Sequence, residues 1–458
     1  MNESTRPSRF RIGWVAAASL VVSNMVGAGI FTTSGFLLEN LRSPLIMLAA
    51  WAVGGMLALC GTLAYAELGA SLPQVGGDYI YLRKAYGPLW GFMSGWMAFF
   101  AGIGTPICLT ALTFTEYLTP LAPGLSIQGH EPFLKVSGLS LTLSAGHLVA
   151  MGLIWLLSLV HYLGIRRGGK LQVAVTSLNM LLIFSFILFA LLFATGDWGH
   201  FTSLPKSAPL VSTGLFPLFA VSMIWIMYSY SGFNAAAYVA GEIERPGRNL
   251  PLALLVGTGT VTMLYLALNA VYIYACPVQE LSGKLDVAKI AAIKLFGPGI
   301  GWLFSTVIAT CALASTSAMV CIGPRIYQAM ASDGIFFSSA ARTSRKFGTP
   351  GVALLLQATW STLLIMVGSF DQLLTYCGFL LSFFAALTVS AVIVLRRRHP
   401  ELVRPYKAWG YPLTPVFFVA VSLWMMIYAV FTRPAESMIG AVVVGLGIPA
   451  YFIWKRKS

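Results

Sequence analysis

Long apolar runs separated by short polar stretches repeat along the whole chain. Most runs hold about 20 residues or more, the length a helix needs to cross the ~30 Å hydrocarbon core of a bilayer. The pattern predicts twelve spans, at residues 12–38, 43–71, 86–117, 143–164, 169–195, 211–241, 250–276, 298–325, 350–368, 371–395, 412–431 and 437–455. It therefore predicts an all-α polytopic membrane protein.

Glycines interrupt the first span near its middle. Gly27 and Gly29 flank Ala28, and Gly costs about 1 kcal/mol relative to Ala inside a helix. In hydrocarbon, loosened backbone is tolerated only where it lines a cavity or is covered by protein. A break here would expose partly positive N–H groups on one half-helix and partly negative carbonyls on the other. These two half-ends would suit a small zwitterion.

A second interruption lies about 205 residues later, at Tyr228 to Asn234, again inside an apolar span. Glycine is frequent in membrane helices, so one break alone would be weak evidence. Interrupted spans in corresponding places of two halves, however, are typical of a transporter with its binding site at the bilayer midplane. The pair of breaks therefore favours a binding site over plain helix packing.

Composition and charge agree with this interpretation. The chain has 458 residues, of which 57% are hydrophobic and 10% charged, whereas a soluble domain carries about 25% charged residues. With the N-terminus inside, 22 of the 29 basic residues fall on the cytoplasmic side. The positive-inside rule then predicts that both termini are cytoplasmic, in a cell membrane. The net charge of +14 thus reflects topology and contact with membrane lipid, and no nucleic-acid partner is expected.

The sequence does not show the residue patterns expected of an enzyme. The five histidines are scattered, and the six cysteines lie in or beside apolar spans without metal-ligand spacing. No catalytic residue, metal or cofactor is therefore expected, and no disulfide framework. A non-transporting sensor would normally add a soluble signalling domain, for which the tails are too short.

Three polar residues inside spans are predicted to reach one depth. Asn179 lies about 13.5 Å beyond Lys170 along a helix, and Ser315 about 15 Å before Arg325, which puts both near Asn24. Glu67 differs, because it lies near the cytoplasmic end of its span. Intramembrane carboxylates are functional candidates, but at this depth pairing with a basic residue, a structural role, is the favoured interpretation.

Several motifs together resemble a known family. They are Gly27-Ala28-Gly29-Ile30-Phe31, Ala66-Glu67-Leu68-Gly69 with Gly76-Gly77-Asp78-Tyr79, Tyr230-Ser231-Gly232-Phe233-Asn234, Glu242 to Pro251, and Arg404-Pro405-Tyr406-Lys407 with Gly410-Tyr411-Pro412. These residues resemble the amino acid–polyamine–organocation (APC) superfamily, most closely its L-type amino acid transporter branch and bacterial relatives.

The resemblance implies a LeuT-type fold of two inverted repeats, with the first and sixth helices broken. The repeats would occupy residues 12–195 and 211–397, after a tail at 1–11; a linker at 398–411 would lead to two peripheral helices and a short tail within 412–458. The implied activity is transport of α-amino acids.

The resemblance also implies a substrate site built from both breaks. Its residues would be Ser23, Asn24, Val26, Gly27, Ala28, Gly29, Ile30, Tyr228, Ser229, Tyr230, Ser231, Gly232 and Phe233. The N–H groups of Gly27 to Gly29 would bind the carboxylate, carbonyls near Ser23 and at Tyr228 to Ser231 would bind the ammonium, and Tyr228 would act as an aromatic gate. Because neither break holds a charged residue, a neutral side chain is predicted.

The sequence departs from the family at one position. Relatives commonly carry a lysine in the fifth helix in the place of a sodium ion, whereas this chain has Asn179. Ser315 and Thr316 could offer oxygen ligands to an ion, but no carboxylate is nearby. We expect Asn179 to accept a hydrogen bond from Ser315 and to donate one to a first-helix carbonyl, without sodium.

The leading hypothesis is therefore a secondary transporter of neutral L-amino acids that works by alternating access and sodium-independent exchange. The alternatives are a proton-coupled symporter and a non-transporting sensor. The cysteine that joins animal relatives to a single-span glycoprotein has no counterpart at 118–142. No disulfide-linked ancillary subunit is therefore expected.

Overall fold

The computed structural model describes residues 12–127, 134–136, 139–141, 143–163, 165–202, 214–344, 346–367 and 370–455. The helices of the first half are α1 (Trp14–Met25), α2 (Ala28–Leu41), α3 (Pro44–Ser71), α4 (Asp78–Tyr86), α5 (Pro88–Met97), α6 (Gly104–Tyr117), α7 (Ala145–Leu163) and α8 (Ile165–Phe193). Those of the second half are α9 (Leu215–Ser229), α10 (Pro246–Ala275), α11 (Val278–Leu281), α12 (Val287–Phe296), α13 (Pro298–Ser332), α14 (Gly351–Val367), α15 (Phe370–Arg398), α16 (Leu413–Thr432) and α17 (Pro434–Lys455).

Short elements complete the chain. A π-helical turn, η2 (Ala98–Ile103), joins α5 to α6, and 3₁₀ turns occur at η3 (Pro123–Leu125), η4 (Trp198–Phe201), η5 (Ala235–Glu242) and η6 (Ser338–Ala341). Two three-residue strands, β1 (Leu134–Val136) and β2 (Leu139–Leu141), pair antiparallel with Leu134 opposite Leu141.

Ten helices of the described residues are long and apolar enough to cross a membrane. The remaining two predicted spans correspond to shorter apolar helices, Leu215–Ser229 and Gly351–Val367. The chain is thus an all-α polytopic membrane protein apart from the small hairpin. The division into repeats at 12–195 and 211–397, with the linker at 398–411, stays a prediction.

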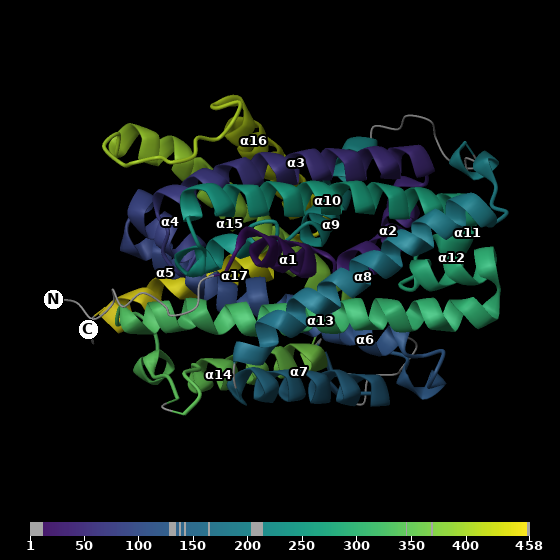
Figure 1. Ribbon diagram of the computed structural model, residues 1–458, viewed down its shortest axis with the longest axis horizontal. Helices are drawn as coiled ribbons and strands as arrows, with labels where there is room; N and C mark the ends of the chain where they lie inside the picture. The colour runs from purple at the N-terminus through teal and green to yellow at the C-terminus, as the bar shows by residue number, and fades with distance from the viewer. Residues whose placement is uncertain are drawn as a thin grey trace.

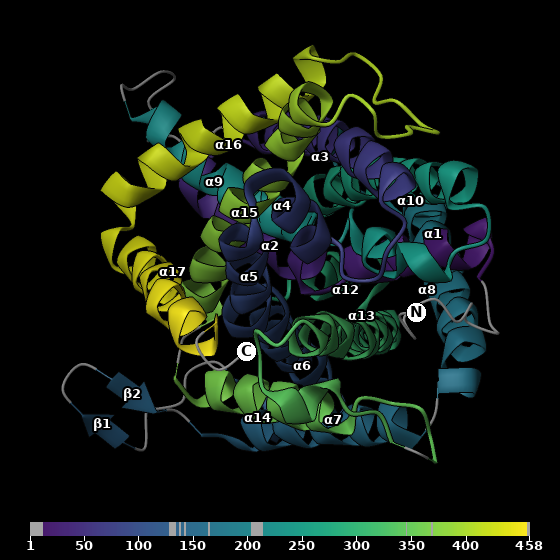
Figure 2. The same ribbon diagram turned by 90° about the vertical axis from the view of Figure 1, so that its left-hand side faces the viewer.

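The long helices run side by side along one direction (Figure 1). Helix α4 and the last turn of α17 lie at one end of the molecule, here named the α4 end, and α11 and α12 lie at the opposite end (Figure 1). Seen from the α4 end, α16 and α17 lie along one edge of the bundle, whereas α7 and α14 lie along another (Figure 2). Helix α10 packs along both α3 and α1, and α13 packs along α6.

Local sequence explains where several helices begin. Pro44 is the first residue of α3, and the side chain of Ser43 accepts a hydrogen bond from the Ile46 N–H at 3.4 Å. Proline suits this position because its missing N–H would have no helical partner there. Proline also opens α5, α10, α13 and α17.

Two span boundaries differ from the predicted ones. The sixth span, predicted as 211–241, is a helix only up to Ser229 and then a turn followed by η5. The eighth span, predicted to end at residue 325, continues to Ser332, because Pro324 does not end the helix. The apolar runs in the sequence indicated both spans, but they did not show that the sixth helix ends at Ser229 or that the eighth continues past Pro324.

Candidate functional site

The first break is a two-residue interruption between α1 and α2. The Val26 N–H donates to the Val22 carbonyl at 2.8 Å, and the Gly27 N–H turns back to the Met25 carbonyl at 2.9 Å. The regular helical ladder of α1 therefore ends there, and α2 restarts at Ala28. In this conformation Gly27 uses its N–H locally. The N–H groups of Ala28 and Gly29 lie in the first turn of α2, where a helix supplies no acceptor.

The second break follows the end of α9 at Ser229. The Ser231 N–H donates to the Tyr228 carbonyl at 2.9 Å, and the Ala235 N–H to the Gly232 carbonyl at 2.9 Å. Gly232 has φ +98°, a region that side chains with a Cβ rarely adopt. The glycine therefore permits the tight turn that separates α9 from η5.

The two breaks touch each other. A Cβ added at Gly232 would lie 2.7 Å from Asn24 Cβ, and one added at Gly29 would lie 2.6 Å from Ser229 Cα. The Thr33 and Ser229 hydroxyls are 3.1 Å apart. The glycines thus let the two broken helices approach to backbone contact, which brings the predicted residues of both breaks together.

Tyr265 of α10 ties the two breaks to the scaffold. Its hydroxyl lies within hydrogen-bonding distance of the Met25 carbonyl at the first break and 3.0 Å from the Ser229 carbonyl at the second. These are carbonyls from the two half-helix ends, where helical partners are missing. Tyr265 could not be predicted from the sequence, because a tyrosine in an apolar span carries no signal of its own.

Two of the predicted aromatic residues point into the protein rather than into the cavity described below. The Tyr230 ring packs at 5.8 Å from Trp51 and 5.1 Å from Tyr265, and its hydroxyl donates to the Trp51 carbonyl at 3.2 Å. Tyr228 is buried. Neither side chain lines that cavity. Val26 and Ile30 are buried as well.

A cavity of about 70 Å³ begins at the breaks. Asn24, Ser231, Gly232 and Phe233 line it there, and Tyr65, Asp78, Asn234 and Tyr238 line it toward the α4 end. Much of its remaining wall is apolar, from Met97, Ile103, Pro106, Met227, Met319, Ile322, Leu381, Phe384 and Ala385. In the sequence, Asp78 and Asn234 stand out only as parts of family motifs, and their place in the cavity was not predicted.

Asp78 is the carboxylate of this cavity. It is the first residue of α4 and is 7% exposed. Its Oδ2 accepts a hydrogen bond from the Tyr238 hydroxyl at 2.7 Å. Burial raises the pKa of Asp78 above its usual range.

Asn179 lies beside the first break, as predicted from its depth. Together with Val22, Ser23, Val26 and Thr176, it lines a second cavity of about 10 Å³. That volume is close to the smallest that holds one water molecule.

The predicted hydrogen bond from Ser315 to Asn179 is wrong. Asn179 Oδ1 instead lies 3.0 Å from the Thr310 hydroxyl. The Ser315 hydroxyl is buried against Gly27 and has no hydrogen-bond partner in the described part of the chain. Thr316 faces α6, where its hydroxyl donates to Thr110 Oγ1 at 2.8 Å. Neighbouring residues of one helix point in different directions, and depth alone does not reveal which of them faces α8.

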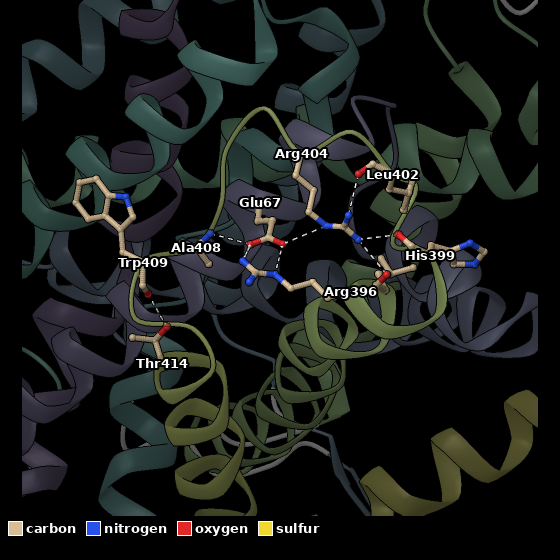
Figure 3. A network of polar contacts seen from close by, with 9 residues as sticks. Glu67, Arg396, His399, Leu402, Arg404, Ala408, Trp409 and Thr414 are labelled. Carbon is tan, nitrogen blue, oxygen red and sulfur yellow. Dashed lines mark hydrogen bonds and ion pairs between the residues drawn. The ribbon is translucent and has the colours of Figure 1, made fainter.

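Glu67 lies apart from the cavity, in a network of polar contacts (Figure 3). Arg396 at the end of α15 donates to Glu67 through Nε at 2.8 Å and Nη2 at 2.6 Å. The Ala408 N–H donates to it at 2.7 Å, and Arg404 Nε is 3.6 Å away. Glu67 therefore pairs with basic residues and joins α3 to the segment before α16.

The described residues contain no group of three or more His, Cys, Asp or Glu residues placed to hold a metal ion. All six cysteines are free thiols. The chemistry of the region around the breaks therefore consists of backbone dipoles, hydroxyl and amide groups, and the Asp78 carboxylate.

Similarity to known proteins agrees with this geometry. A family model described as "Amino acid permease" matches residues 12–452. The human "Large neutral amino acids transporter small subunit 2" is 30% identical over 457 residues, covering 97% of this chain and 81% of the relative. The mouse "Asc-type amino acid transporter 1" is 28% identical (97% and 82%), and the human "b(0,+)-type amino acid transporter 1" is 27% identical (97% and 87%).

One expectation does not survive these comparisons. The first name describes that relative as a small subunit, which means part of a larger assembly. The expectation that no disulfide-linked ancillary subunit accompanies this chain is therefore not borne out.

The match to the family model extends over almost the whole chain and includes both helix breaks. The relatives named above are all transporters and cover most of the chain as well. This multi-pass membrane protein belongs to the amino acid permease family.

Proposed function

We propose that the protein is a secondary transporter that exchanges neutral L-amino acids across a cell membrane by alternating access, without sodium. The observation that carries the proposal is the direct contact of two helix breaks at the start of a cavity. Such a site presents N–H groups and carbonyls to a zwitterion without requiring charged side chains.

The breaks offer partners for both charged groups of an amino acid, its carboxylate and its ammonium. The N–H groups of Ala28 and Gly29, at the positive end of α2, suit the carboxylate. The ammonium group suits the carbonyl ends of α1 and α9. Tyr265 already contacts the Met25 and Ser229 carbonyls, so it would hold both ends in place while the substrate binds beside them.

The cavity wall favours a neutral side chain. Near the breaks it is formed by Asn24, Ser231, Gly232 and Phe233, with methionines beyond them. No charged residue lines the cavity beside the breaks, because Asp78 lies toward the α4 end, so a charged side chain held at the breaks would lose several kcal/mol of hydration without a partner next to it. Among the relatives, one is named for large neutral amino acids, which supports the same class.

The proposal also includes the orientation of the protein in the membrane. The Ile12 N–H donates to the Glu242 carbonyl at 2.9 Å, and the Glu244 N–H donates to the Ile12 carbonyl at 3.0 Å. The start of α1 therefore lies beside the segment that follows η5, toward the α4 end. Since basic residues concentrate on the side of the N-terminus, the positive-inside rule favours a cytoplasmic α4 end.

Counterflow in proteoliposomes tests this function. Vesicles preloaded with unlabelled leucine or alanine should accumulate labelled leucine, and empty vesicles should accumulate far less. In competition, neutral amino acids should inhibit more strongly than lysine, arginine or glutamate. Equal uptake by empty and preloaded vesicles would reject exchange, and stronger inhibition by a charged amino acid would reject the substrate class. A protein that binds leucine but moves none would be a sensor.

A further inference from the structure

The α4 end of the cavity holds a carboxylate whose hydrogen bonding is incomplete. Oδ2 of Asp78 accepts a hydrogen bond from Tyr238 at 2.7 Å. Oδ1 is buried and has no hydrogen-bond partner within the described ranges. Buried polar atoms are nearly always paired, so an unpaired carboxylate oxygen beside a cavity calls for an occupant.

Other unpaired hydroxyl groups surround the same place. The hydroxyls of Tyr65 and Thr388 are buried beside Asp78 and favour its charged form, although neither reaches ordinary hydrogen-bonding geometry in the described structure. Ser382, which lines the cavity with Tyr65, has an unpaired buried hydroxyl as well. Three elements, α3, α4 and α15, thus direct unpaired oxygen atoms toward one region.

This region contains a negative group without a positive partner. The titratable groups that face Asp78 are Tyr65 from α3, Tyr238 from η5 and Tyr81 from its own helix. Among the described residues, no lysine, arginine or histidine forms an ion pair or a hydrogen bond with Asp78. A buried carboxylate is stable only when it is paired or neutralised. Its natural complement is a cation that carries several N–H donors.

We propose that Asp78, Tyr65 and Thr388 form an inner subsite for the α-ammonium group of the amino acid as it passes between the helix breaks and the α4 end. The inference rests on the proposed transport function. An ammonium has three donors, which match Oδ1 of Asp78 and the two hydroxyl oxygens. The cavity that Asp78 and Tyr65 line has room for this group.

The subsite predicts that substrate binding differs between the two faces of the protein. It lies beyond the breaks on one side only, so it acts on substrate that enters or leaves at the α4 end. Removing the carboxylate should weaken apparent binding at that face by about tenfold or more, the usual effect of losing a hydrogen bond to a charged group. Binding at the opposite face should change little.

A pH effect follows from the same geometry. Burial raises the pKa of Asp78, so the carboxylate becomes neutral at a higher pH than an ordinary aspartate does. As pH falls through this raised pKa, the ammonium loses its counter-charge. The KM at the α4 face should therefore rise with falling pH, and the KM at the opposite face should not.

The test measures the KM for labelled leucine at each face, in vesicles that contain the protein in one or the other orientation. It compares the wild type with Asp78→Asn, Tyr238→Phe and Glu401→Gln. Asp78→Asn should raise the KM at the α4 face and abolish its pH dependence. Tyr238→Phe removes the hydrogen bond to Oδ2 but keeps the carboxylate, and should have a much smaller effect. Glu401→Gln removes an exposed negative charge at the α4 end, outside the cavity, and should match the wild type.

Each result is decisive. An unchanged KM in Asp78→Asn would mean that the site holds only water and would overturn the subsite. Equal effects of Asp78→Asn and Tyr238→Phe would show that the contact between them is merely structural. If Asp78→Asn does not fold, the wild-type pH profile decides, because equal profiles at both faces would also overturn the proposal. Failure of wild-type exchange would instead reject the proposed function.

Discussion

At the scale of single residues, the glycines of the first break face neighbouring helices. A Cβ at Gly29 would lie 2.6 Å from the Cα and Cβ of Ser229 in α9, and one at Gly27 would lie 2.6 Å from the Ser315 hydroxyl in α13. From the resemblance, the N–H groups of these glycines are expected to bind a substrate carboxylate. The structure adds a second reason, which is the approach of two other helices.

Gly29→Ala should therefore reduce transport by about tenfold or more, because the new methyl group meets backbone that cannot shift without moving α9. The measurement is exchange of labelled leucine, normalised to the amount of reconstituted protein. Gly152→Ala in α7 is the matched control, since its Cβ would meet nothing within 4 Å. Near-normal exchange by Gly29→Ala would show that the contact is not needed.

Two buried tyrosines near the breaks differ in the carbonyl groups that their hydroxyls contact. Tyr265 bridges both breaks, whereas Tyr230, one of the predicted site residues, packs into the scaffold beside Trp51. Both are buried tyrosines in apolar surroundings. Only the direction of the side chain separates them, and that direction depends on helix packing.

At the scale of elements, Glu67 connects three segments that are far apart in sequence. It receives hydrogen bonds from Arg396 in α15 and from the backbone of Ala408, and it lies 3.6 Å from Arg404 Nε (Figure 3). The Arg396 guanidinium also lies 3.8 Å from the ring centre of Tyr411. These contacts fix the segment before α16 against α3.

Glu67→Gln should destabilise the protein by about 3 kcal/mol, because it leaves the partly buried guanidinium of Arg396 without its counter-charge. A lower thermal denaturation temperature in detergent would register this loss. Glu401→Gln serves as the control, since its pair with His399 is exposed and surface pairs contribute little. If the two variants denature at the same temperature, the network is not a source of stability.

The two breaks also divide their helices into half-helices. The first break separates α1 from α2, and the second separates α9 from η5. The Ile12–Ile243 bridge joins the half-helices that lie toward the α4 end. Thr33 and Ser229 join the halves on the other side of the breaks. These contacts hold each pair of half-helices together, an arrangement that fits alternating access by movement of one group of helices against another.

At the scale of the whole molecule, the cavity and the small space beside Asn179 lie on different sides of α1. The small space is lined by apolar side chains together with Ser23, Thr176, Asn179 and Cys311, without a carboxylate. A bound sodium ion needs several oxygen ligands and compensation for its lost hydration. This environment supports a neutral contact instead, and the one that Asn179 makes joins α8 to Thr310 of α13.

Exchange should therefore proceed equally well when choline replaces sodium at fixed pH. Asn179→Ala should lower the rate to a similar extent in both salts, because it removes the contact with Thr310 and not an ion ligand. Exchange of labelled leucine in proteoliposomes measures both. Loss of most wild-type activity in choline would mean that an ion binds beside Asn179.

The sequence by itself determined the class of the protein and the location of its breaks. Apolar runs long enough to cross a bilayer must form helices, because hydrocarbon offers no other partner for the backbone. Glycines within such runs therefore stand out, and Gly27, Gly29 and Gly232 were found in this way. The depth of Asn179 followed from the fixed rise of a helix.

Only the tertiary structure decided which side chains meet. Tyr265 bridging the breaks, Thr310 in place of Ser315 beside Asn179, and Asp78 at the end of the cavity all depend on the rotation of one helix against another. In a chain that is apolar almost throughout, periodicity does not mark the inward face of a helix, because lipid and protein interior accept the same residues. Packing supplies that information, and the polar contacts near the breaks follow from it.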